Sequence, residues 1–220
     1  MKLNFGALLC LSTSLGFIFF YAPEEAQQGI VQKIFYIHVS SALTMYIGFF
    51  LSFLASLMFL LEHKTFWDEI SVCAAEVAFF LCTVVLLTGP IWAKPIWGAW
   101  WTWDPRLTTT FLLWMMYAAY LVLRSYLEGS SRQRTVSAIL AIIAFLDVPL
   151  IHFSVRLWRG IHPSVIGSKQ GGLPPSMQLT LTLTLIAFVM FFFALFMTRL
   201  RLEQTRNQVA ALYLKREGKS

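Results

Sequence analysis

The chain has 220 residues, of which 58% are hydrophobic and 13% are charged, and its formal net charge is +6. This composition excludes one or two ordinary soluble domains and indicates a chain whose solvent is largely lipid. The basic residues lie between and after apolar segments, so membrane orientation explains them better than nucleic-acid binding does.

Six apolar segments are each long enough to cross a hydrocarbon layer, which takes about 20 helical residues. In chain order they lie at residues 5–21, 34–61, 70–92, 107–127, 136–153 and 177–197. The first has only Lys2 before it and no clear A-x-A cleavage site after it, so we expect a retained signal-anchor helix. The sequence therefore predicts an all-α, polytopic membrane protein with six transmembrane helices.

Basic residues are distributed unequally between the two sides of the predicted membrane domain, residues 1–198. One side carries eleven of them: Lys2, Lys64, Arg124, Arg132, Arg134, Arg199, Arg201, Arg206, Lys215, Arg216 and Lys219. The other side carries six: Lys33, Lys94, Arg106, Arg156, Arg159 and Lys169. The positive-inside rule therefore predicts that both termini are cytoplasmic and that two loops, residues 92–106 and 154–176, are external.

The basic segment 199–220 continues the last predicted span on the cytoplasmic side. We interpret it as a solvated helix stabilised by charge pairs. A docking helix for a cytoplasmic partner is the alternative.

Two kinds of chemistry are disfavoured by the motifs. The cysteines Cys10, Cys73 and Cys82 lie in apolar segments and form no C-x-x-C pair, which is typical of small core residues and not of a disulfide oxidoreductase. No G-x-x-x-x-G-K-[ST] motif occurs, so the chain cannot power transport with ATP by itself.

The third and fourth spans are joined by an unusual aromatic segment. Four of the eight tryptophans, Trp97, Trp100, Trp101 and Trp103, fall within seven residues. One or two aromatic residues at each helix end suffice for an interfacial belt. The higher density indicates a platform for a flat aromatic ligand, although an aromatic belt remains the alternative.

The remaining residues of this loop have expected supporting roles. Gly98 lets the backbone turn or approach a neighbour closely. Asp104 is expected to hold the loop by accepting from an indole N–H, a backbone N–H or Arg106. Cations close to the platform could pair with acidic groups on a ligand, and the candidates are Lys94, Arg106, Arg156 and Arg159.

Three of the four histidines are predicted to lie on the outer side. His38 is near the outer end of the second span, His152 closes the fifth, and His162 lies in the loop beyond. Heme is a flat apolar disc whose iron accepts two axial imidazoles, and tryptophan faces pack well against it. The residues alone favour heme or another planar cofactor as strongly as a plain aromatic belt.

The segment Trp97–Arg106, with the sequence W-G-A-W-W-T-W-D-P-R, resembles the tryptophan-rich "WWD" signature of heme-handling membrane proteins in cytochrome c maturation. With Tyr36-Ile37-His38-Val39 and segments 89–97 and 149–155, the chain is similar to the heme exporter protein C (CcmC) family from about Ala22 to the tail. Larger members of the superfamily carry many more spans than this chain can hold.

The resemblance implies a site and a set of partners. It implies that His38 and His162 ligate the iron of heme b, and that the macrocycle is held by the loop residues Lys94, Trp97, Gly98, Trp100, Trp101, Trp103, Asp104 and Arg106. It also implies a bacterial inner-membrane location, handover to a CcmE-like heme chaperone, and CcmA/CcmB-like ABC transporter and CcmD-like single-span subunits. Whether the handover is a lyase-like enzymatic activity stays open.

Two positions depart from the pattern that the resemblance implies. Asp147 stands where an amide is more familiar, and Arg156 where an acidic residue is frequent. Nothing in the sequence explains Asp147, whereas Glu76 in the third span is expected to bond to a neighbouring helix. Two other functions remain alternatives: a b-type membrane cytochrome that transfers electrons, and a small-molecule transporter with a site near the bilayer midplane.

Overall fold

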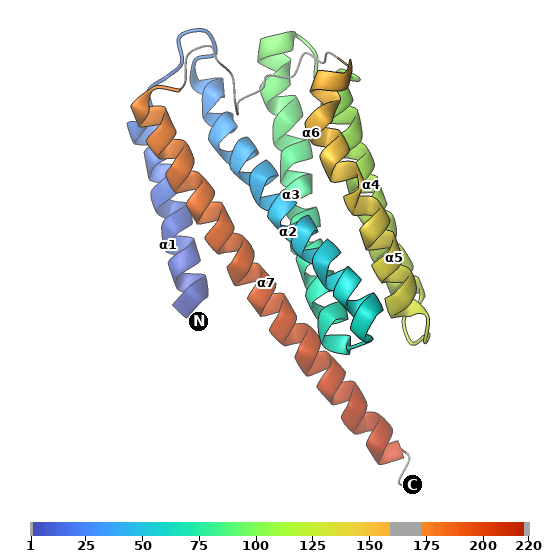
Figure 1. The fold of residues 1–220 in the computed structure, drawn as a ribbon. Coiled ribbons are helices and arrows are strands. Elements are labelled where there is room, and N and C mark those ends of the chain that lie inside the picture. Colours follow the sequence, from blue (N-terminus) through green and yellow to red (C-terminus); the bar gives the residue numbers. More distant parts are fainter. Residues whose placement is uncertain (1, 159–172, 218–220) are drawn as a thin grey trace.

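The computed structural model describes residues 2–158 and 173–217, and these form a bundle of long helices (Figure 1). The order is α1 (Lys2–Gly16), the π-helical turn η1 (Phe17–Tyr21), the 3₁₀ turn η2 (Ile30–Lys33), α2 (Ile34–Glu62), α3 (Thr65–Trp97), α4 (Pro105–Tyr126), α5 (Gln133–Phe145), α6 (Asp147–Trp158) and α7 (Pro175–Glu217).

Six stretches of the described chain are long and apolar enough to cross a membrane. They are Leu3–Tyr21, Ile30–Glu62, Thr65–Trp97, Pro105–Tyr126, Gln133–Ser154 and Pro175–Tyr213. The fifth span combines α5 with most of α6. The predicted all-α architecture with six membrane-spanning helices is confirmed.

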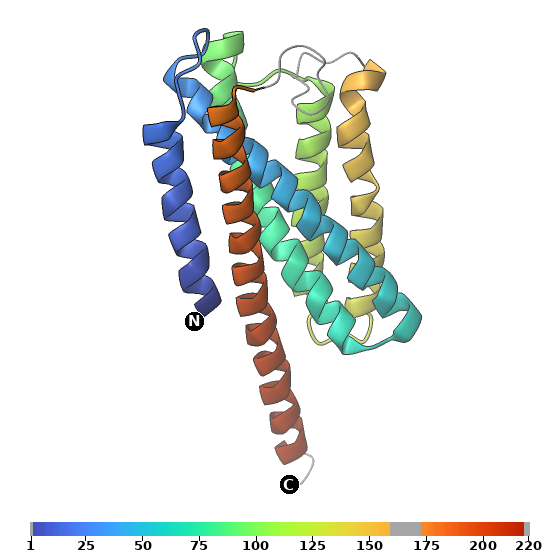
Figure 2. The ribbon, with the colours of Figure 1, turned by 60° about the vertical axis from the view of Figure 1, so that its left-hand side comes forward.

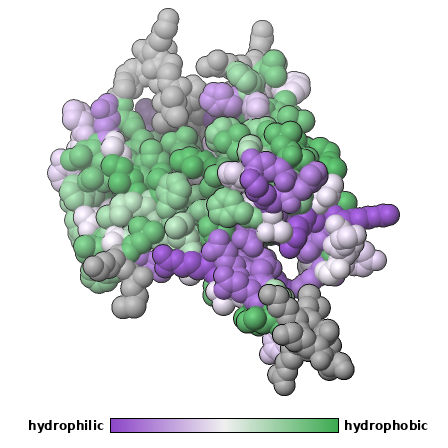
Figure 3. Space-filling view, turned by 60° about the horizontal axis from the view of Figure 1, so that its bottom comes forward, coloured by the Kyte–Doolittle hydropathy of each residue, from purple (hydrophilic) through white to green (hydrophobic). Residues whose placement is uncertain are grey.

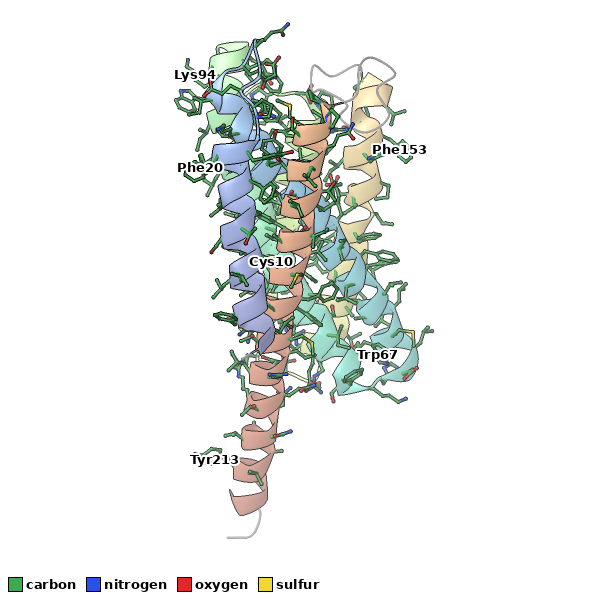
Figure 4. The ribbon with its side chains drawn as sticks, turned by 90° about the vertical axis from the view of Figure 1, so that its left-hand side faces the viewer. Cys10, Phe20, Trp67, Lys94, Phe153 and Tyr213 are labelled. Atoms are coloured by element: carbon green, nitrogen blue, oxygen red, sulfur yellow. The ribbon has the colours of Figure 1, made fainter. Side chains whose placement is uncertain are left out.

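Both termini point to the same end of the bundle (Figure 1). At the opposite end, which we call the motif end, α3 gives way to α4 through residues 98–104. Figure 4 places Lys94 and Phe153 at the motif end and Trp67 at the other, and Tyr213 lies on the part of α7 that projects beyond the bundle. That the termini are cytoplasmic stays a prediction.

The centre of the bundle is the antiparallel pair α2 and α3, with α1 and α7 on one flank and α4, α5 and α6 on the other (Figures 1 and 2). Lipid supplies no hydrophobic force between helices, so small residues and interhelical hydroxyl bonds hold such a pair together. Ser71 of α3 illustrates this, because its hydroxyl lies 2.7 Å from that of Ser56 and 3.1 Å from that of Ser52.

Gly48 of α2 shows how tight this packing is. A Cβ atom added there would lie 2.6 Å from Cε2 of Phe192 on α7 and 2.8 Å from Cβ of Ala78 on α3. At Gly6 of α1 the nearest atom, Cε of Met190, would be 3.9 Å away. The close contact of α2, α3 and α7 therefore depends on the presence of glycine, with no side chain, at position 48.

We expect Gly48→Ala to be less stable than the matched variant Gly6→Ala by about 1–3 kcal/mol, the usual cost of overpacking a core. Both substitutions gain the same helix propensity, about 1 kcal/mol, so the comparison isolates the steric term. Thermal unfolding of the two variants in detergent measures the difference. Equal midpoints would show that α7 can move away from Gly48 without cost.

Ion pairs connect neighbouring helices at the end of the bundle that carries the termini. Arg124 of α4 donates to both carboxylate oxygens of Asp68 on α3, at 2.7 and 2.6 Å. Arg199 of α7 does the same to Glu76 on α3, at 2.6 and 2.8 Å. The expected bond from Glu76 to a neighbouring helix is confirmed. Seen from this end, hydrophilic residues gather around the base of α7 and hydrophobic residues cover the flank (Figure 3).

One helix extends further than the hydropathy pattern indicated. The α3 helix continues past residue 92 to Trp97 although Pro90 and Pro95 lie within it, as membrane helices allow when neighbouring groups satisfy the freed carbonyls. Lys94 and Trp97 are therefore helical, and the α3–α4 connection is only residues 98–104. The α7 helix runs unbroken from Pro175 into the polar tail.

Candidate functional site

His38 lies in the second turn of α2, at the motif end, and is 9% exposed. Its Nδ1 atom is 2.9 Å from the hydroxyl of Thr88 on α3. Its ring meets that of Trp92 at a centroid distance of 5.8 Å, edge to face. A Cβ atom at Gly89 would lie 3.3 Å from Cε1 of His38. One turn of α3, from residue 88 to 92, therefore forms the surface on which this imidazole rests.

The contact with Thr88 constrains the tautomer of His38. The Thr88 hydroxyl also lies 2.7 Å from the backbone carbonyl of Val84. When this hydroxyl donates its single hydrogen to Val84, it accepts from His38, so Nδ1 carries the hydrogen and Nε2 carries the lone pair. This tautomer, with one nitrogen donating to a fixed partner and the other basic, is the form in which histidine ligates metals.

Trp92 is itself held from two sides. Its indole N–H donates to Oε1 of Gln28 at 3.0 Å, and its ring lies 6.0 Å from that of Phe35, edge to face. Gln28 belongs to the connection between η1 and η2. The segment before α2 thus holds the Trp92 side chain in place, and that side chain in turn limits the movement of the His38 ring.

The connection 98–104 begins at a left-handed residue. Gly98 has φ 74°, a conformation that a residue with a Cβ adopts only with strain. Its N–H donates to the carbonyl of Lys94 at 3.0 Å, and the Lys94 ammonium group donates to the Gly98 carbonyl at 2.9 Å. Gly98 therefore has the turning role expected of it, and Lys94 stabilises the end of α3.

The connection ends at a buried N-cap. The Asp104 carboxylate accepts from the backbone N–H of Arg106 at 3.0 Å, which is one of the three partners we expected. Its carbonyl accepts from both the N–H and the hydroxyl of Thr108, at 2.9 and 3.0 Å. With Pro105 at the first helical position, this is a strong start signal for α4. Arg106 is half-buried in the first turn.

The tryptophans of the connection differ in exposure. Trp100 and Trp103 are 58% and 76% exposed, whereas Trp101 is half-buried. The Trp101 ring packs edge to face on Trp103 at 6.0 Å and on Phe111 of α4 at 6.1 Å. Trp101 therefore anchors the loop to α4 while Trp100 and Trp103 present their rings outward.

A ladder of rings continues from Trp101 into the bundle. Phe111 stacks on Trp114 of α4, and Trp114 stacks on Phe79 of α3 at 5.3 Å. The indole N–H of Trp114 donates to Thr83 at 2.9 Å. The buried indole N–H of Trp101, in contrast, has no acceptor among the residues that the structure describes. A buried donor of this kind usually has a partner, so this atom is suited to a ligand or an ordered water.

The other histidines are distributed as follows. His152 is exposed on α6, beside Phe153. His162, with Arg159, lies outside the described residues, in the connection between α6 and α7. Within 2–158 and 173–217, no three His, Cys, Asp or Glu side chains gather to form a metal site.

The residues that fix His38 were not singled out as site residues from the sequence. Thr88 and Trp92 appeared to be the final turns of an apolar span, and Gln28 part of an ordinary connection. The signal that could have revealed Thr88 is a hydroxyl directly before Gly89-Pro90, where the helix offers a gap for another side chain. The contacts with Thr88 and Trp92 join His38 to this turn of α3, which leads into Trp97 and the motif.

Comparison with known proteins gives one family throughout. The sequence profile described as heme exporter protein C matches residues 2–215. A protein of that name from Bradyrhizobium diazoefficiens is 33% identical over 196 residues, which cover 88% of this chain and 74% of the relative. One from Paracoccus denitrificans is 31% identical over 220 residues, with 98% and 90% covered. One from Escherichia coli strain K12 is 30% identical over 207 residues, with 91% and 84% covered.

Proposed function

The chain belongs to the heme exporter protein C family, and from this premise we propose that it holds heme b at the motif end and delivers it to a membrane-anchored, CcmE-like chaperone. The family membership implies a role in heme handling for cytochrome c maturation. The name of a relative from Marchantia polymorpha, 29% identical over 198 residues, also refers to cytochrome c biosynthesis. The motif end then faces the outside of a bacterial inner membrane, with both termini in the cytoplasm.

The observation that carries this proposal is the state of His38. Its Nδ1 atom contacts the Thr88 hydroxyl, which also lies within hydrogen-bond distance of the Val84 carbonyl. The imidazole is buried and is held by Thr88 and Trp92, and the tautomer with its hydrogen on Nδ1 has its lone pair on Nε2. An axial heme ligand needs these properties, because a bound iron takes a neutral imidazole nitrogen whose ring cannot rotate away.

The residues of the motif end suit a large flat apolar molecule with an acidic edge. Trp100 and Trp103 offer exposed ring faces, Trp101 offers a buried N–H, and Lys94 and Arg106 supply positive charge at the same end. His162 is the proposed second ligand. It lies four residues beyond Trp158, the last residue of α6 at the motif end. In this proposal the protein contributes orientation and electrostatics around a reactive cargo.

The proposed partners follow from the same family. They are the CcmE-like chaperone on the outer side, CcmA/CcmB-like ABC transporter subunits and a CcmD-like single-span subunit. Electron transfer by a b-type cytochrome is less well supported. His38 lies near a helix end, whereas a transmembrane electron path calls for histidine pairs within the bilayer.

The proposal is tested by optical spectroscopy and co-purification. The purified protein supplied with heme b should give the spectrum of iron with two imidazole ligands. A tagged CcmE-like chaperone should retain the protein on a column, and its bound heme should increase with time. A protein that binds heme but never transfers it would be a store, and the delivery part of the proposal would then be wrong.

Replacing Thr88 by valine should weaken heme binding by about 10- to 100-fold, the usual effect of removing the partner that orients a metal-ligating histidine. The substitution conserves shape but removes the hydroxyl that contacts Nδ1 of His38. Titration of heme into the purified variant gives the affinity. The matched control is Thr182→Val on α7, whose hydroxyl only donates to the carbonyl of Gln178 on an exposed helix face. Equal affinities in the two variants would contradict the orienting role.

A further inference from the structure

Asp147, the first residue of α6, is an acidic residue within a membrane span, and its carboxylate has no bonding partner among the described residues. It is 6% exposed, and neither carboxylate oxygen has a hydrogen-bond partner in the part of the chain that the structure describes. The other buried acids are satisfied. Asp68 is bound by Arg124, Glu69 by Asn207, and Asp104 by the N–H of Arg106. Asp147 is therefore not a structural anchor of the same kind.

The surroundings of Asp147 come from several helices. Tyr46 of α2 and Cys82 of α3 both lie within electrostatic range of it, and Arg106 of α4 lies within the same range of Tyr46. On α6 itself, His152 is exposed and one turn further on. The last residues of α5, 138–145, carry no ionisable side chain. The site is thus a small polar cluster enclosed by an apolar bundle.

The position of Asp147 in the backbone is equally unusual. It is the first residue of α6 and follows Leu146, which separates α5 from α6 while keeping helical dihedral angles (φ −62°, ψ −20°). Pro149, in the next turn, has no N–H to donate to the carbonyl of Phe145, so the junction is weakened there. Helices that are interrupted within a membrane span are common places for movement and for polar sites.

Burial and isolation make the charged form of this side chain unfavourable. An ionised carboxylate surrounded by hydrocarbon must be paired, hydrated or protonated. The described arrangement has no cation bonded to Asp147, so it suits the neutral acid. The ionised form would favour an arrangement in which water reaches the junction. The proton on Asp147 and the packing of the junction are therefore coupled.

The α6 helix connects this junction to the motif end. It packs along α4, the helix that begins at the tryptophan motif, and its last residue, Trp158, precedes the connection that contains His162. The distance along α6 from Asp147 to Trp158 is about 16 Å, at about 1.5 Å per residue. A tilt of α6 at Asp147 would therefore displace Trp158 at the motif end.

We propose that Asp147 is a positioning residue whose protonation controls the α5–α6 junction, so that the neutral acid holds α6 in place and the ionised form releases it. Because α6 leads to His162, this rests on the proposed heme site for its functional consequence. Heme would be held tightly when Asp147 carries a proton and loosely when it does not. Proton binding at this position would thus regulate heme release.

The first test uses heme-free protein, so it does not depend on the proposed function. Hydrogen exchange along α6 is measured in lipid nanodiscs from mildly acidic to mildly alkaline pH for the wild type and for Asp147→Asn, which mimics the neutral acid in shape. After correction for intrinsic rates, the wild type should lose protection in α6 as the pH rises, and Asp147→Asn should not. Identical profiles in the two proteins would overturn the proposal.

The second test follows heme binding over the same pH range. The affinity of the wild type should fall with pH, by up to about tenfold for each pH unit, the limit for one linked proton. Asp147→Asn should remove that dependence. His152→Gln, which removes the histidine of α6, should preserve it. A dependence that persists in Asp147→Asn and disappears in His152→Gln would assign the proton to His152. If the wild type binds no heme at any pH, the heme proposal fails and the exchange experiment alone decides on the junction.

Discussion

Heme binding should weaken by more than about 100-fold when His38 is replaced by alanine, because losing only the partner of a ligating histidine already costs about 10- to 100-fold. The variant should also lose the spectrum of iron with two imidazole ligands. His38→Ala should still fold, since the ring lies against one turn of α3 near the end of the bundle and away from the central contacts of α2 and α3. The measurements are a heme titration and an optical spectrum of the purified variant in detergent.

The other outer histidines make this prediction specific. His162→Ala should change the spectrum in the same way as His38→Ala, and His152→Ala should leave it intact. If His152→Ala abolishes the spectrum and His162→Ala does not, the proposed second ligand is wrong. A spectrum that survives in all three variants would place the heme site elsewhere.

Removing the two exposed indoles together should lower heme retention by roughly 5- to 150-fold, since each aromatic contact contributes about 0.5–1.5 kcal/mol beyond its buried area. The variant is Trp100→Ala with Trp103→Ala. Neither ring is deeply buried, so thermal stability should change little and the two-imidazole spectrum should keep its shape. Affinity, unfolding midpoint and the rate of transfer to the chaperone are the quantities to compare.

A matched control separates the platform from general surface hydrophobicity. Phe20, in η1, is 93% exposed and lies towards the motif end (Figure 4). Phe20→Ala removes a large exposed ring at that end without touching the motif and should leave heme affinity unchanged. If the double tryptophan variant binds heme and transfers it normally, these rings are an interfacial belt and not a platform. Trp101→Ala is not equivalent, because Trp101 also packs on Phe111 and its loss should destabilise the loop.

The contacts between α2 and α3 predict that bundle stability and the orientation of His38 are linked in this protein. The same pair of helices, α2 and α3, supplies the tight contact at Gly48, the hydroxyl cluster at Ser71, and the His38–Thr88 contact near the motif end. A change that separates the two helices would therefore also move Thr88 away from His38. Stability measurements should accompany every affinity measurement on this pair.

Composition and spacing were enough to predict the six spans, the clustering of the tryptophans and the loop-holding role of Asp104. These features are local, because a run of about 20 apolar residues or an Asp-Pro helix start acts through its immediate neighbours. The helix ends were predicted less well. The α3 helix continues through Pro90 and Pro95, since packing against other helices compensates for bonds that proline removes.

The tertiary structure decided which atoms meet across the bundle. Thr88 and His38 are 50 positions apart, and Trp92 and Gln28 are 64 apart, so neither contact leaves a periodic trace in the sequence. Likewise, an acid in a span can be paired, as Glu76 is by Arg199, or isolated, as Asp147 is in the described structure. Both side chains are carboxylic acids within apolar segments, so residue chemistry and hydropathy do not distinguish the two cases. The difference arises from the helices that pack around each carboxylate, and only the fold determines that.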